Sequence, residues 1–147
     1  MPSITQQYNA YRGDTWVSRK YIFIEEEVPP GTTEEEIIAG IESGRFHHKD
    51  LREYQIDADV FVDVGLWFPL TDYLKIDSLG RFMHFEMTAS KTNDIADAPN
   101  VADKDFPITG RYDIQFCKKN NGVVETLWSG DFALEDDITK RDPCKVV

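Results

Sequence analysis

The stretch that decides the fold is GRYDIQF at residues 110–116, followed by NNG at 120–122 and TLWSG at 126–130. These three segments are typical of a strand, a tight turn and a second strand. Asn-Gly can adopt the positive φ angles of a two-residue hairpin turn, which would set the register of the strand pair locally. The chain therefore predicts a β-hairpin over about residues 111–134, with a bend or bulge at Gly130 in its second strand.

The most regular alternation in the chain predicts a strand from Gln55 to Val64. One face would carry Ile56, Ala58, Val60, Val62 and Val64, and the other Gln55, Asp57, Asp59, Phe61 and Asp63. Strict alternation is typical of an antiparallel sheet with one buried face and one wet face. Further strands are expected at residues 16–24, 73–77 and 81–89, the last with Met83, Phe85 and Met87 on one face.

One convincing helix is predicted after the break at residues 29–31. Thr33 and Glu36 have the spacing of a capping box, in which hydroxyl and carboxylate satisfy opposite free backbone amides. Three isoleucines then form an apolar stripe, and Gly44 is placed to end the helix. We expect this short helix to cover a sheet, and a further helical turn within the long loop at 92–106.

These elements predict a mainly β chain that forms a single antiparallel β-sandwich or open barrel, with one short helix between early strands. Residues 1–12 are assigned to an N-terminal arm, with a first strand as the alternative. Residues 13–139 are expected to form the sandwich domain, and residues 140–147 a polar C-terminal tail.

Length and composition suit one globular domain. The chain has 147 residues, of which 41% are hydrophobic and 12% aromatic. Its apolar runs are shorter than the ~20 residues of a membrane span. Residues 1–7 lack the basic and apolar regions of a signal peptide. We therefore expect no membrane partner, and either a cytoplasmic product or one that leaves the cell inside a particle.

The charge balance argues against nucleic-acid binding. A net charge of −11 and a pI of about 4.6 would repel a phosphate backbone. Solubility is the simplest role for this charge, and the alternatives are docking against a basic partner and mimicry of nucleic acid. Cys117 and Cys144 lack metal or redox spacing, so two unpaired thiols are favoured over a disulfide.

The residues that could carry chemistry form no catalytic or metal-binding motif. Asp57, Asp59 and Asp63 share a strand face and could approach a calcium ion, but a solvated face explains them better. The histidines His47, His48 and His84 lack zinc-ligand spacing. Ser129 precedes a glycine but stands outside any nucleophile elbow. No catalytic, cofactor-binding or metal residue is therefore predicted, and no enzyme activity or cofactor.

Three large aromatic residues have two possible roles. Trp67, Phe68 and Trp128 could line a groove that binds a carbohydrate or peptide. In a small sandwich such rings more often supply the core or a protein interface. Coplanar exposed rings would favour a carbohydrate-binding module, and buried rings would exclude these residues from that role.

A set of short segments, taken in order, resembles a known family. The segments are Gly13–Trp16, Asp50-Leu51 with Tyr54, Phe85–Thr92, Tyr112–Gln115, Gly122, Thr126-Leu127, Gly130 and Asp137–Thr139. They are similar to the small β-sandwich domain of tailed-bacteriophage structural proteins, in particular the amino-terminal domain of upper-baseplate and tail-fibre attachment proteins. The similarity extends from about Arg12 to Thr139. The segments at 25–49 and 97–107 are longer than this pattern.

The resemblance implies a non-enzymatic virion structural protein. Such a protein would be an adaptor that joins tail, baseplate, neck or fibre components, assembled in the host bacterial cytoplasm. Its partners would be other virion proteins and further copies of itself in a symmetric assembly. The alternatives are a carbohydrate- or ligand-binding β module, and an acidic phage inhibitor of a host protein.

Overall fold

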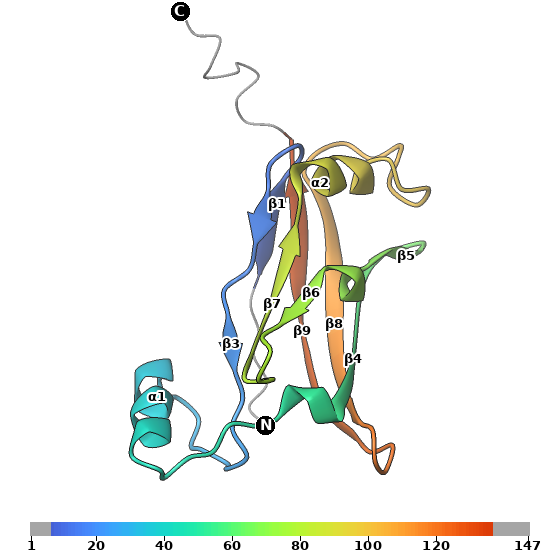
Figure 1. Ribbon diagram of the computed structural model, residues 1–147. Coiled ribbons are helices and arrows are strands. Elements are labelled where there is room, and N and C mark those ends of the chain that lie inside the picture. The colour runs from blue at the N-terminus through green and yellow to red at the C-terminus, as the bar shows by residue number, and fades with distance from the viewer. Residues whose placement is uncertain (1–6, 137–147) are drawn as a thin grey trace, which may run out of the picture.

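The computed structural model describes residues 7–136, apart from the side chains of residues 125–128. Its strands form two sheets that face each other (Figure 1), so the predicted mainly β sandwich is confirmed. The larger sheet has the order β1-β9-β8-β4-β5, with β1 at Tyr8–Tyr11, β4 at Tyr54–Val62, β5 at Gly65–Pro69, β8 at Ile108–Lys118 and β9 at Val124–Glu135. In the smaller sheet, β7 (Phe82–Met87) pairs with β2 (Trp16–Val17), β3 (Tyr21–Ile22) and β6 (Leu74–Ile76).

The first strand extends the domain toward the N-terminus. Residues 8–11 form β1, which pairs in parallel with β9 in the register Tyr8↔Phe132 to Tyr11↔Glu135. Tyr8 and Ala10 are buried in the core. The assignment of residues 1–12 to an arm is therefore wrong for 8–11, where the alternative of a first strand holds. The sheet is also not purely antiparallel, because this pair is parallel.

The predicted hairpin is present as β8 and β9, but its turn differs. Lys118 and Val123 close a four-residue loop, in which Gly122 has a φ of 68° and Asn121 accepts a hydrogen bond from the Val123 amide at 2.9 Å. No non-glycine residue in the described range has a positive φ, so the two-residue Asn-Gly turn is not formed. The register shift lies at Gln115–Cys117 of β8, whereas pairing is regular at Gly130.

The alternation predicted for β4 is confirmed up to Val60. Ile56, Ala58 and Val60 are buried, whereas Val64 is 71% exposed because the strand ends at Val62 and a turn follows. Beyond the end of the β4–β5 pairing, the side chain of Thr71 takes the place of a backbone hydrogen-bond partner for Ala58. Its hydroxyl accepts a hydrogen bond from the Ala58 amide at 2.7 Å and donates one to the Ala58 carbonyl at 3.0 Å. A side chain thus satisfies two backbone groups at a gap in the ladder.

The predicted strand at 16–24 is divided into β2 and β3. The register with β7 changes by one residue across the interruption at residues 18–20. Within it, the Ser18 hydroxyl accepts the Phe85 amide at 2.8 Å, and the Ser18 amide donates to the Phe85 carbonyl at 2.9 Å. Ile24 continues the chain as an isolated bridge to His48. Ser18 therefore keeps β7 paired across the interruption while the register shifts by one residue.

The core lies between the two sheets. From β7, Met83, Phe85 and Met87 all point inward with no exposed surface, as their shared face predicted. A polar contact also joins the sheets, because the hydroxyls of Tyr8 and Tyr21 lie 2.6 Å apart inside the core. Burial raises the pKa of Tyr8, so both phenols stay neutral and can share this hydrogen bond.

The helices differ from expectation in number and place. The predicted helix is α1 (Glu34–Glu42), and the Thr33 hydroxyl accepts the Glu36 amide at 3.2 Å. Its isoleucines are half-buried or exposed, and α1 stands beside the sandwich (Figure 1), so the prediction that it covers a sheet is wrong. A second helix, α2 (Ala89–Ile95), crosses one end of the sandwich and begins three residues earlier than the expected helical turn at 92. Two short 3-10 turns lie at Leu51–Glu53 and Leu70–Tyr73.

Replacing Thr71 with valine tests the side chain that completes the ladder at Ala58. The variant keeps the shape but removes the hydroxyl, so we expect the free energy of unfolding to fall by about 1–2 kcal/mol. Thr71→Ser keeps the hydroxyl and is the matched control, with a smaller loss. Urea denaturation followed by tryptophan fluorescence measures both. Equal losses would mean that the methyl group, not the hydrogen bonds, stabilises the fold here.

Candidate interaction surface

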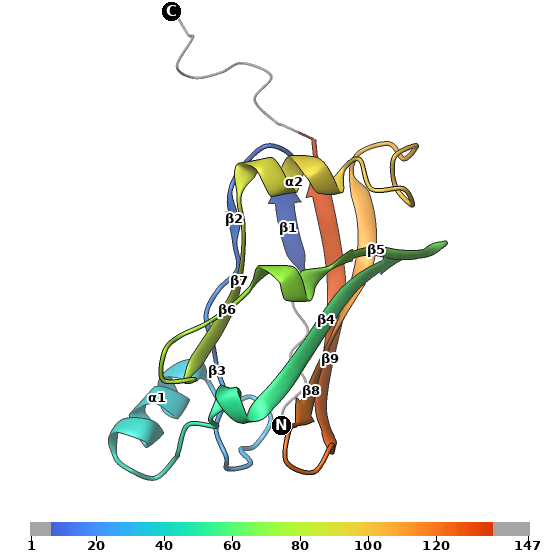
Figure 2. The same ribbon diagram turned by 45° about the vertical axis from the view of Figure 1, so that its right-hand side comes forward.

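The outer face of the larger sheet carries the strongest candidate for a functional surface. Side chains that alternate with the core residues point outward here, among them Asp59 of β4, Arg111 and Asp113 of β8, and Asp131 of β9. No other layer of the described chain covers this face in Figures 1 and 2. The chemistry of this surface is therefore set by the outward-pointing residues, which are every second residue along each strand.

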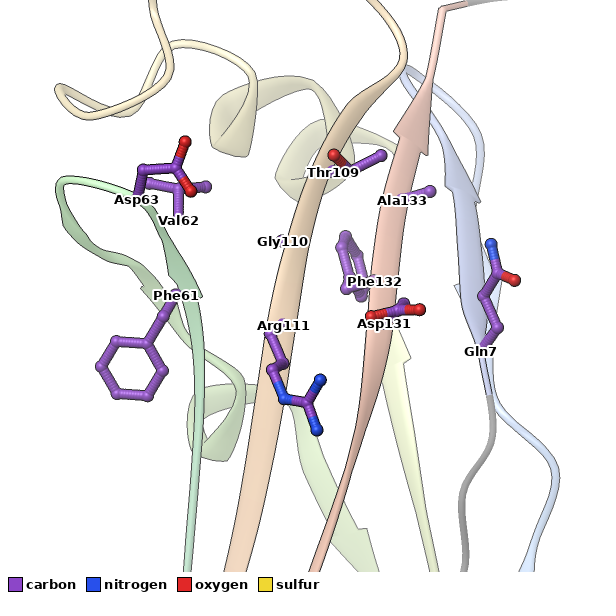
Figure 3. A pocket seen from close by; sticks show the side chains of 10 residues that line it. All are labelled: Gln7, Phe61, Val62, Asp63, Thr109, Gly110, Arg111, Asp131, Phe132 and Ala133. Carbon is purple, nitrogen blue, oxygen red and sulfur yellow. The ribbon is translucent and has the colours of Figure 1, made fainter.

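A hollow of about 560 Å³ lies on this face where β4, β8 and β9 run side by side (Figure 3). Its lining residues are Gln7, Phe61, Val62, Asp63, Thr109, Gly110, Arg111, Asp131, Phe132 and Ala133. Gly110 is required because β4 passes close to it. A Cβ at this position would lie 2.6 Å from the Phe61 carbonyl oxygen, a backbone atom that cannot rotate away. The missing side chain would lie on the core side of β8, against Trp67 and Val60, and its absence permits β4 to pack closely at the edge of the hollow.

Charged groups mark the lower part of the hollow. Arg111 extends from β8 toward β9 (Figure 3), where it donates a hydrogen bond to the Ser129 hydroxyl at 3.1 Å. Asp131 stands directly opposite Arg111 in the strand register. The Ser129 hydroxyl therefore orients the Arg111 guanidinium.

An exposed apolar cluster borders the hollow on the β4–β5 hairpin. Phe61 and Leu66 are directly paired across the two strands and are 39% and 44% exposed, and Val64 at the turn is 71% exposed. The hairpin projects from the body of the molecule (Figure 2). It is anchored near its turn by Asn100, whose side-chain amide donates to the Leu66 carbonyl at 2.6 Å. Grouped apolar side chains on a projecting, anchored element are typical of a protein interface.

The carboxylates below the hairpin repel one another. Asp59 and Asp113 are directly paired across β4 and β8, and Asp57 lies two residues along the same face. Partial burial raises the pKa of Asp59, and the charges of Asp57, Asp113 and Asp72 raise it further. The proposed calcium ligand Asp63 lies elsewhere, at the end of the hairpin beside the hollow. The residues that the structure describes include no group of three or more His, Cys, Asp or Glu placed to hold a metal ion.

The three histidines have separate surroundings. His47 Nδ1 lies 2.7 Å from a Glu26 carboxylate oxygen, and His84 Nε2 lies 3.3 Å from Glu86. His48 packs edge-on against Phe82, and its Nδ1 is buried without a hydrogen-bond partner. His47 and His48 share the rim of a second hollow, which lies near the end of α1.

The aromatic residues that suggested a carbohydrate groove are in the core. Trp67 and Phe68 are only 4% and 5% exposed, and Trp67 Nε1 donates to the Ile95 carbonyl at 2.8 Å. Neither ring can stack on a sugar. The side chain of Trp128 lies outside the described side chains. Cys117 is a half-buried free thiol, and Cys144 lies outside the described residues.

Sequence reasoning missed the hollow and the apolar hairpin. One signal was present, since Phe61 interrupts a strand face that otherwise carries aspartates and glutamine. The role of Gly110 was not visible, because it depends on a strand about fifty residues away in the chain. Val64 was placed on the buried face by extending the alternation past the end of the strand.

Comparisons with known proteins leave the family open. No protein-family model matches the chain, and no curated protein matches it. Among solved structures, the natural killer cell receptor Nkp44 aligns with 13% identity and a TM-score of 0.41 over 92% of this chain and 100% of its own. InlP of Listeria monocytogenes aligns with 11% identity and a TM-score of 0.35 over 90% of this chain, which spans 26% of InlP. Scores this low carry no argument about function. Within the described residues, every helix is too short or too polar to cross a membrane.

Replacing Asp113 with asparagine tests the repulsion on the outer face. The variant removes the charge directly opposite Asp59, so the pKa of Asp59 should fall and the free energy of unfolding at pH 7 should rise by about 0.5 kcal/mol. A carboxyl whose pKa is raised by folding disfavours the folded state at pH values above that pKa. The gain should therefore vanish as the pH falls below the pKa of Asp59, where that carboxyl is neutral and no longer repelled.

Asp103→Asn is the control for this prediction, because Asp103 is exposed on the long loop. Carbon-detected NMR titration of the carboxyl groups gives the pKa, and urea denaturation at several pH values gives the stability. A pKa of Asp59 that stays unchanged in Asp113→Asn would contradict the electrostatic account.

Proposed function

We propose that this protein is a non-enzymatic adaptor that acts through protein–protein contacts, as a structural protein of a tailed-bacteriophage virion. The observation that carries the proposal is the β4–β5 hairpin, with exposed Phe61, Val64 and Leu66 beside an open hollow. Burying such a cluster against a partner supplies apolar area, and the polar groups around the hollow supply orientation. In a symmetric particle, each copy repeats the contact, so modest single contacts add up to a stable assembly.

The phage assignment rests on the resemblance of the segments between Arg12 and Thr139 to upper-baseplate and tail-fibre attachment domains. In that setting the adaptor would join tail, baseplate, neck or fibre components and contact further copies of itself. The long segments that depart from the resemblance, at 25–49 and 97–107, are candidates for contacts specific to this protein. The second segment contains Asn100, which anchors the β4–β5 hairpin near its turn.

An acidic inhibitor of a host protein is the second candidate. The observation that favours it is the carboxylate group Asp57, Asp59 and Asp113 on one exposed face, where repulsion already raises the pKa of Asp59. A basic partner surface would relieve this repulsion. The two candidates differ in stoichiometry and location, because an inhibitor forms a soluble complex and an adaptor is built into the particle.

Mass spectrometry of purified phage particles tests the proposed function. A structural adaptor should be present in fixed proportion to the other virion proteins, in a multiple of three or six copies if it lies at the tail axis or baseplate. Light scattering of the recombinant chain gives its state before assembly. Absence from particles together with early expression during infection would remove the adaptor proposal in favour of the inhibitor.

A valine pair tests whether the hairpin is the contact. In a phage whose gene for this protein is deleted, a plasmid would supply the Val64→Ser variant. This substitution removes an apolar contact from the β4–β5 turn. We expect about 10-fold less of this variant in particles, the equivalent of one buried valine. Val123→Ser is the matched control, because Val123 is 51% exposed on the opposite β8–β9 hairpin. Equal incorporation of both variants would move the contact away from the β4–β5 hairpin.

A further inference from the structure

A second hollow, of about 410 Å³, lies far from the first one and has a different character. It is formed where the end of α1, the segment at 46–52 and the turn between β6 and β7 meet (Figure 2). Its polar rim consists of His47, His48, Asp50, Arg52 and Arg81, and its apolar walls are Ile41, Phe46 and Leu79. Four of these five polar side chains are basic in character, in a chain whose net charge is −11.

Two of the basic groups are already paired with carboxylates. Arg52 makes a two-pronged ion pair with Asp50, with Nε–Oδ1 and Nη2–Oδ2 distances of 2.9 Å each. His47 is paired with Glu26, whose carboxylate also accepts the His47 backbone amide at 2.8 Å. These pairs build the wall of the hollow and engage Arg52 and His47 with carboxylates.

Arg81 differs from these paired groups, although the charge of the Asp77 carboxylate lies near it. Within residues 7–136, its guanidinium is in no ion pair. Its backbone position is nevertheless fixed, because a carboxylate oxygen of Asp77 accepts the amides of Arg81 and Phe82 at 2.6 and 2.8 Å. Gly80, with a φ of 71°, lets the same turn pack against Asp50, where a Cβ would approach the carboxylate to 2.4 Å. The turn therefore holds Arg81 at the rim in a defined place.

His48 adds a neutral, titratable group next to this cation. Burial lowers the pKa of His48, the charge of Arg81 lowers it further, and Asp77 opposes this shift. Because Nδ1 is also buried without a partner, the imidazole is neutral at pH 7. Arg81 thus presents an unpaired guanidinium at the hollow, beside a ring that a nearby anion would help to protonate.

We infer that this hollow binds a single carboxylate on an aliphatic stem, as presented by an acidic side chain of a partner protein. One unpaired guanidinium matches a monoanion, and Asp50 on the rim would repel a doubly charged phosphate. Ile41, Phe46 and Leu79 match the methylene groups that precede such a carboxylate. This binding concerns a different surface from the β4–β5 hairpin, so it holds or fails independently of the proposed function.

The test uses butyrate as the probe and the imidazole of His48 as the reporter. Butyrate carries one carboxylate on a short aliphatic stem. The pKa of His48 is measured by NMR at increasing butyrate and constant ionic strength. We expect a saturable rise in the pKa, with a dissociation constant on the order of 1 mM. His84 on the same protein is the internal reference, because it is paired with Glu86 and should not respond.

Variants separate this site from general anion binding. Arg81→Gln should abolish the saturable response, whereas the matched control Arg111→Gln, in the other hollow, should keep it. The amide spectrum of Arg81→Gln verifies its fold, and Arg81→Lys should retain a weakened response. The inference is overturned if His48 in the natural protein shows no saturable shift, if Arg81→Gln responds equally, or if inorganic phosphate binds more tightly than butyrate.

Discussion

The alternation of buried and exposed side chains along β8 is the constraint on which the rest of the structure depends. β8 lies at the centre of the larger sheet, between β9 and β4, so both of its edges are paired. Tyr112, Ile114 and Phe116 have no exposed surface and form the middle of the core. The residues between them must then point to the opposite side. Core and outer face are therefore assigned together, and any slip of one residue would exchange them.

The outer face shows what this constraint leaves open. A strand face in water tolerates many polar residues, so its composition is free to serve binding. Here the outer face has two different regions. Carboxylates around Asp59 repel one another in one region, and the exposed apolar residues of the β4–β5 hairpin lie beside the hollow in the other. The hollow itself lies beside the point where β4 packs close to β8, which Gly110 permits because it has no side chain. The features proposed for binding are thus consequences of how the sheet is built.

Small polar side chains close the sandwich where its strands are too short to do so. The hydroxyl of Thr71 accepts a hydrogen bond from the Ala58 amide, and the hydroxyl of Ser18 accepts one from the Phe85 amide. The hydroxyl of Thr92, in α2, accepts the Gly13 amide at 3.1 Å and donates to the Asp14 carbonyl at 2.8 Å, which joins α2 to the turn after β1. Each replaces a backbone partner that a regular ladder would have supplied. Such residues allow the smaller sheet to be irregular without leaving buried amides unsatisfied, and they tie α2 to the strands that it covers.

The sequence by itself determined the mainly β class, the β8–β9 hairpin, the inward face of β4 and the cap of α1, because these depend on periodicity and on neighbours within a few residues. The tertiary structure alone decided that Tyr8–Tyr11 joins β9 in parallel, that α1 stands beside the sandwich, and that Trp67 is buried under α2. It also decided where both hollows lie, because Gly110 approaches Phe61, and the charge of Arg81 acts on His48, only after distant segments have packed together. Local spacing carries information about which face a side chain takes, whereas contacts between distant segments depend on the three-dimensional arrangement of the whole domain.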